Sequence, residues 1–202
     1  MQSAHNQFGA NIGRARDLQA LFVNLKASTA GALDLTDILR AAIVSAVSAL
    51  DTFIHEITRN GMLEIFQNVR PRTDAFGRFP ISMDNVLLVV ATPGNTQWLE
   101  EEIRSQHGWL SFQQPDKVAD AIRLFSSKEL WKEVASRLGI DPKTAKNRLA
   151  LIVDRRNKIA HEADMDPSSP GSRWPIDDLL VQDAIDTLEQ IGDAIFAVIA
   201  TP

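Results

Sequence analysis

The spacing of apolar residues constrains the fold of this 202-residue chain more than any other feature. Apolar side chains recur at three- and four-residue steps in segments such as Ile12 to Ala27, Leu35 to Ile57 and Ile176 to Ala200, and this spacing places them on one face of a helix. The sequence shows no convincing strand pattern, no repeat and no low-complexity tract. It therefore predicts an all-α protein.

Local start and stop signals subdivide this helical pattern. Asn60-Gly61 is expected to break or bend the second long helix. Ser82 is a good N-cap, and Pro115 suits the first turn of a helix. Gly139 is expected to end one helix, and Asp141-Pro142 to start the next. This next helix carries the residues with the clearest chemical interest.

Composition limits the setting and the number of domains. The chain contains no cysteine, which excludes disulfides and thiolate metal sites and makes a reducing, cytoplasmic setting the expectation. The segment from Met1 to Ala10 does not resemble a signal peptide, and no apolar run reaches the roughly 18 residues that span a membrane. We therefore expect one helical domain over residues 1–202, with an N-terminal helix in residues 1–30 and no membrane contact.

The charge is unevenly distributed along the chain. The net charge of −5 argues against binding of nucleic acid over the whole surface. One stretch is nevertheless basic, because only Asp154 opposes the cations there. These cations are Lys143, Lys146, Arg148, Arg155, Arg156 and Lys158. Both a solvated helix face and a local phosphate-binding surface would explain such a stretch.

The segment 156–161 combines residue types that suit phosphodiester cleavage. Asn157 and His161 are four residues apart and share a helix face. Arg156 lies about 140° around the axis from His161, but its long side chain can swing toward the same edge. RNA supplies its own nucleophile, the 2′-hydroxyl. An imidazole can then move the proton and a guanidinium can stabilise the phosphate, so no metal is required. An exposed arginine with a histidine in the last helical turn has the same spacing.

The residues around this segment resemble those of a known family. The sequence Ile-Val-Asp-Arg-Arg-Asn-Lys-Ile-Ala-His-Glu-Ala-Asp over 152–164 is similar to the signature helix of HEPN domains, in particular the RiboL-PSP-HEPN branch. The segment Arg40 to Glu56 resembles the long first core helix of that group, and Ser111 to Ala121 resembles its middle section. The resemblance covers roughly Leu35 to Ile199 and implies a HEPN-type bundle with additional helices.

The resemblance implies a metal-independent endoribonuclease with no cofactor. Its two signature helices would meet across the two-fold axis of a homodimer, with Arg156 and His161 as the catalytic pair and Asn157 in support. The family also suggests a role as a toxin or in defence or stress, with a cognate antitoxin whose identity the sequence does not reveal.

Four further residues are candidates for supporting roles. Asp51 could approach the signature helix and influence His161, although Asp51 and His55 also have the spacing of an ordinary local ion pair. Three cations, Lys146, Arg155 and Lys158, are candidates for RNA contacts. A surface or salt-bridge role is the alternative for Arg155. No spacing of acids and histidines favours a metal site.

Two other functions remain open. A HEPN protein without catalytic activity would use the same basic groove to hold RNA, a nucleotide or a protein. The segment from Glu133 to Leu149 also reads like a helix-turn-helix, the unit with which many regulators bind DNA. Its second helix, however, continues directly into Arg156 and His161, and the net charge of the chain is negative.

Overall fold

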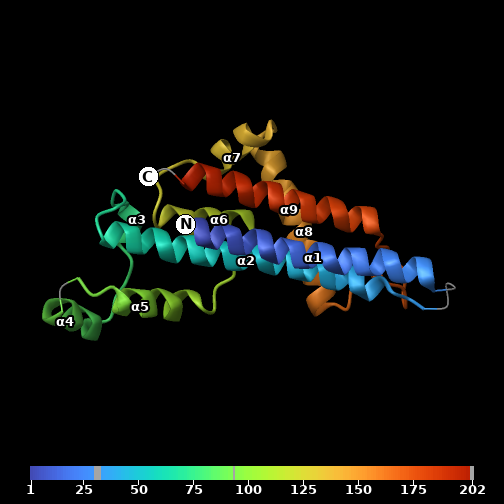
Figure 1. Ribbon diagram of the computed structural model, residues 1–202, viewed down its shortest axis with the longest axis horizontal. Coiled ribbons are helices and arrows are strands. Elements are labelled where there is room, and N and C mark those ends of the chain that lie inside the picture. The colour runs from blue at the N-terminus through green and yellow to red at the C-terminus, as the bar shows by residue number, and fades with distance from the viewer. Residues whose placement is uncertain (30–32, 93, 201–202) are drawn as a thin grey trace.

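The computed structural model describes residues 1–29, 33–92 and 94–200, and within these ranges the protein is all-helical (Figure 1). Residue 30, the end of the expected N-terminal helix, lies outside the described residues. The helices are α1 (Gln2–Ser28), α2 (Thr36–Phe66), α3 (Asp74–Gly77), α4 (Met83–Ala91), α5 (Gln97–His107), α6 (Pro115–Arg123), α7 (Leu130–Leu138), α8 (Pro142–His161) and α9 (Asp178–Ile199). The predicted all-α class is confirmed.

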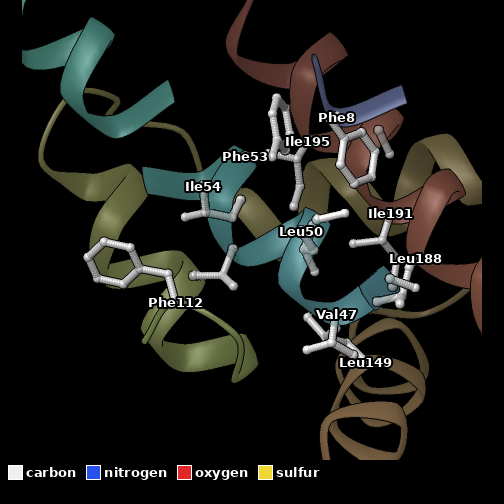
Figure 2. Packing of buried hydrophobic residues seen from close by; sticks show 14 of the residues in the cluster. Phe8, Val47, Leu50, Phe53, Ile54, Phe112, Leu149, Leu188, Ile191 and Ile195 are labelled. Carbon is white, nitrogen blue, oxygen red and sulfur yellow. The ribbon is translucent and has the colours of Figure 1, made fainter. Parts of the chain in front are cut away.

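Three long helices, α1, α2 and α9, run along the length of the molecule and form its main bundle (Figure 1). The central helix α2 also contacts α5, α6 and α8. The buried side chains recur at helical spacing, and Phe8, Leu50, Phe53 and Ile195 meet where α1, α2 and α9 pack together (Figure 2). Helix α8 is attached to this core by Leu149 and Val153.

The predicted break at Asn60-Gly61 is wrong, because α2 continues without interruption to Phe66. The glycine serves close packing instead. A Cβ atom at Gly61 would lie 2.3 Å from Cγ and Cδ2 of Phe125, so only a residue without a side chain lets this ring approach the helix. Gly61 therefore brings the end of α6 against α2.

Most of the predicted helix boundaries are confirmed. The Ser82 side chain accepts a hydrogen bond from the Asn85 N–H at 3.2 Å, and Asp141 accepts one from the Thr144 N–H at 3.0 Å. Pro115 is the first residue of α6, and Gly139 ends α7 in the left-handed region, with φ of 66°. Gly139 and the two residues after it form the short turn between α7 and α8.

Helices α4 and α5 lie to one side of the main bundle (Figure 1). Trp98, Leu99 and Ile103 of α5 form a small second core with Met62 of α2. Helix α4 contains no buried residue.

Helix α2 is long and apolar enough to cross a membrane if only length and composition are considered. This is weak evidence for a membrane span, because the buried core helix of a soluble protein has the same properties. In α2, 56% of the apolar window is buried inside the protein.

Replacing Gly61 with alanine should destabilise the protein by about 1–3 kcal/mol, because the added methyl group overlaps the Phe125 ring. Gly13→Ala in α1 is the matched control. No atom lies within 4 Å of a Cβ at that position, so the control should be neutral or stabilise the helix by about 0.5–1 kcal/mol. Urea unfolding measures both effects, and equal stability of the two variants would contradict the role given to Gly61.

Candidate functional site

The segment predicted to carry the chemistry forms the last two turns of α8. Arg156 Nη1 donates a hydrogen bond of 3.0 Å to Oδ1 of Asn157. Asn157 lies one turn before His161 on the same face. The hydrogen bond therefore brings the guanidinium from the side of the helix where Arg156 originates toward the face that carries His161. His161 itself is exposed, whereas Arg156 is half-buried.

The backbone directly after His161 adopts an uncommon conformation. Ala163 and Asp164 both have positive φ, of 51° and 58°. Each such residue that is not glycine costs about 1–2 kcal/mol. The Asp164 N–H donates back to the carbonyl of Lys158 at 3.0 Å, which closes the end of the helix. Such strain persists only where the surrounding structure enforces it, and it is common at functional sites.

A buried cluster of charges enforces this conformation. Asp164 is 0% exposed, and its Oδ2 accepts hydrogen bonds from Arg40 Nε at 2.7 Å and Arg155 Nη2 at 2.8 Å. Both arginines also donate to the backbone carbonyl of Trp174, at 3.0 and 3.1 Å. We refer to Arg40, Asp164 and Arg155 as the buried cluster. It fastens the end of α8 and the following loop to α2.

The environment of Arg155 identifies its structural role. Burial lowers the pKa of its guanidinium; Asp164 opposes this effect, and the neighbouring Arg40 adds to it. Besides Asp164 and Trp174, the group donates to the carbonyl of Pro175 at 3.1 Å. Its side chain is thus engaged in the salt bridge that the sequence left open as the alternative to an RNA contact.

Asp51, the candidate supporting residue on α2, bonds to a segment other than α8. Asp51 Oδ1 accepts from the Phe112 N–H at 2.7 Å, and Oδ2 accepts from Gln113 at 3.0 Å, so this carboxylate holds the connector before α6. It also lies 3.8 Å from Nε2 of His55, the local pair considered in the sequence. Among the described residues, the hydrogen bonds of Asp51 go to this connector and none goes to α8.

The two candidate lysines on α8, Lys146 and Lys158, lie at different distances from Arg156 and His161. Lys158 lies three residues before His161. It forms an ion pair with Asp154 at 3.0 Å, and its Nζ lies 5.5 Å from the ring centre of Trp174. Lys146 lies near the start of α8, ten residues before Arg156, and pairs with Asp116 at 3.0 Å. Only Lys158 is therefore close to the candidate pair.

A groove of about 770 Å³ lies beside the end of α8. Ile159 and Ala163 form its edge, and small residues of α2, such as Ser45 and Ser48, form part of its floor. Ile159 lies on α8 three residues after Arg156, so the two residues originate from the same side of the helix. The groove therefore adjoins the side from which the Arg156 side chain turns toward His161.

His107, at the end of α5, is buried. Its ring packs edge-on against Phe79 and Phe112. Burial lowers the pKa of His107 to about 4, and the nearby His55 adds to this effect. The sequence offered no signal for this position, because Phe79 is remote along the chain. Among the described residues, no group of three or more acidic or histidine side chains is arranged to hold a metal ion.

Fold and geometry define an all-α bundle with an arginine–asparagine pair and an exposed histidine at a rigidly held helix end. The chain matches no protein-family model, no curated protein and no solved structure among those with which it was compared. The likeness to HEPN domains therefore rests on the residues of the sequence.

Replacing Asp164 with alanine should lower the free energy of unfolding by about 3–5 kcal/mol, because it leaves the buried guanidinium of Arg40 and the half-buried one of Arg155 without their carboxylate. Asp166→Ala is a suitable control, since Asp166 lies in the same loop and its side chain accepts hydrogen bonds from the neighbouring Ser168. Chemical denaturation measures both variants. If both variants lose a similarly small amount of free energy of unfolding, the buried cluster does not hold the loop.

The lowered pKa of His107 predicts a pH-dependent stability. Unfolded, the histidine titrates near its usual pKa of about 6.5, whereas in the folded protein it stays neutral down to about 4. The unfolded state thus binds more protons within this window, and the free energy of unfolding should fall as pH is lowered from 6.5 toward 4. In His107→Phe this part of the pH dependence should disappear. Urea unfolding at several pH values measures the free energy of unfolding of both proteins. If this free energy depends on pH in the same way in both, His107 is not the source of the pH dependence.

Proposed function

We propose that the protein is a HEPN-type endoribonuclease that cleaves RNA without a metal ion and acts as a homodimer. The observation that carries the proposal is the hydrogen bond between Arg156 and Asn157, which brings a guanidinium to the helix face of the exposed His161. A group that binds phosphate and a group that transfers protons are thus available to one ligand.

The chemistry needs only these side chains and the RNA itself. The 2′-hydroxyl attacks the neighbouring phosphorus while an imidazole removes its proton, and the bond from phosphorus to the 5′-oxygen breaks. An imidazole returns a proton to this leaving oxygen. The Arg156 guanidinium stabilises the charge that develops on the phosphate oxygens. The products are a 2′,3′-cyclic phosphate end and a 5′-hydroxyl end.

The need for a second protomer follows from this chemistry. One proton must be removed and another returned on opposite sides of the phosphorus, and two imidazoles meet this requirement more directly than one. Because His161 is exposed in the last turn of α8, a second copy of the chain can bring its own His161 close to it. A cytoplasmic location, and a toxin, defence or stress role with an antitoxin partner, belong to the same proposal.

The decisive experiment measures cleavage of single-stranded RNA in the presence of EDTA. His161→Ala should lower the cleavage rate by about 10²- to 10⁴-fold, the usual contribution of a general acid or base. Arg156→Ala should lower it by about 10²- to 10³-fold. His5→Gln is the control, because His5 lies on α1 beside Asp193 and should leave the rate unchanged.

Three outcomes would contradict the proposal. Unchanged cleavage by the His161 variant would remove its catalytic role, and a requirement for magnesium would exclude the mechanism. Full activity of a strictly monomeric protein would exclude the shared site. RNA binding without cleavage, across many substrates, would favour the non-catalytic binding module. A gel shift that favours duplex DNA over RNA would instead favour the helix-turn-helix alternative.

A further inference from the structure

A second cleft, of about 860 Å³, lies near the opposite end of α8 from His161. It is formed by α3 and its flanks, the end of α6, the start of α7 and the first turns of α8. Its charged lining comprises six cations and two acids, an excess of four positive charges in a protein whose net charge is −5. The cations are Arg72, Arg78, Arg123, Lys128, Lys132 and Lys146. We call this feature the basic cleft.

The cations of the basic cleft come from segments far apart in the sequence, so the fold has brought together charges that repel one another. Among the described residues, three of them form exposed ion pairs, Arg123 with Asp120, Lys132 with Glu129 and Lys146 with Asp116, and Lys128 donates to the carbonyl of Val198 at 2.7 Å. Such exposed pairs contribute little to stability and exchange readily for another anion. The cleft is therefore available to a ligand with several negative charges.

The start of α7 provides further donors to the cleft. The side chain of its N-cap residue, Glu129, makes no capping hydrogen bond within the described chain. The first backbone N–H groups of a helix favour anions in this situation. Ser127, which is exposed, adds a hydroxyl group to the same wall.

The apolar residues of the cleft do not provide anchors for a protein partner. Leu130 and Trp131 line it but are only 4% and 6% exposed, and the indole N–H of Trp131 already donates to the carbonyl of Pro115 at 2.8 Å. Interfaces with proteins usually depend on aromatic or aliphatic groups that insert between the partners. Recognition here relies on charge, which fits the regularly spaced phosphates of a polynucleotide.

We propose that the basic cleft binds the phosphate backbone of a single-stranded RNA whose scissile bond lies at the other end of α8. Helix α8 links the two places, and its rise of about 1.5 Å per residue puts Lys146 and His161 roughly 22 Å apart along the axis. A strand of several nucleotides can span this length. The inference rests on the proposed function, because it takes RNA as the ligand.

The test measures binding of a fluorescein-labelled uridine oligonucleotide of about 12 residues. The protein is the full chain with His161→Ala, so that bound RNA stays intact. Combined Arg72→Gln, Arg78→Gln and Lys132→Gln should weaken binding at least tenfold. The slope of log affinity against log salt concentration should fall by about two, since each phosphate contact on a single strand contributes roughly 0.7.

A matched control removes the same charge elsewhere. Lys26, Lys117 and Arg137 lie outside the cleft lining, and their combined replacement by glutamine should leave affinity and salt slope close to those of the parent. Circular dichroism and the unfolding midpoint verify that both triple variants are folded.

The outcomes separate this inference from the proposed nuclease. If wild-type protein cleaves RNA but the cleft variant binds as tightly as the control, the inference is wrong and the nuclease remains. If the cleft variant loses binding but wild-type protein never cleaves, the nuclease is wrong and the cleft remains an RNA-binding surface. Competition by polyglutamate as effective as that by unlabelled RNA would assign the cleft to an acidic protein and overturn the inference.

Discussion

The buried cluster of Arg40, Asp164 and Arg155 is the interaction on which the candidate site depends. Two guanidinium groups share one carboxylate oxygen, at 2.7 and 2.8 Å, away from water. Burial of these charges costs free energy, which their mutual pairing and the hydrogen bonds of both arginines to the Trp174 carbonyl offset. Because the three residues come from α2, α8 and the loop after α8, their pairing fixes the end of α8 in one position relative to the main bundle.

Features that depend on neighbouring residues could be predicted from the sequence, and features that depend on tertiary packing could not. Ser82, Pro115 and Asp141 act within a single helical turn, so their types and positions were sufficient. Gly61 carries the same local signal as a helix-breaking residue. Its effect is decided by Phe125, more than sixty residues later, whose ring occupies the space that a side chain would need.

The residues of the candidate site also fall into those whose surroundings a local pattern predicts and those whose surroundings depend on tertiary packing. Arg156, Asn157 and His161 share one helix end, so the helical period alone predicted that Asn157 and His161 share a face. The surroundings of Arg155 and Asp51 depend on Asp164 and on the connector at Phe112, and no local pattern indicates either. Arg40 did carry a signal: a charged residue at the start of an apolar core helix needs a buried partner.

A catalytic group at the end of a helix faces a physical difficulty, because helix ends fray and active sites need side chains held to within about 0.5 Å. His161 lies in the last turn of α8, and its side chain is exposed, so packing around the ring does not restrain it. The restraint comes from the backbone that follows. The buried cluster and the hydrogen bond from the Asp164 N–H to the Lys158 carbonyl hold Ala163 and Asp164 in their strained conformation. The stability of that cluster and the geometry available to His161 are thus set by the same three charges.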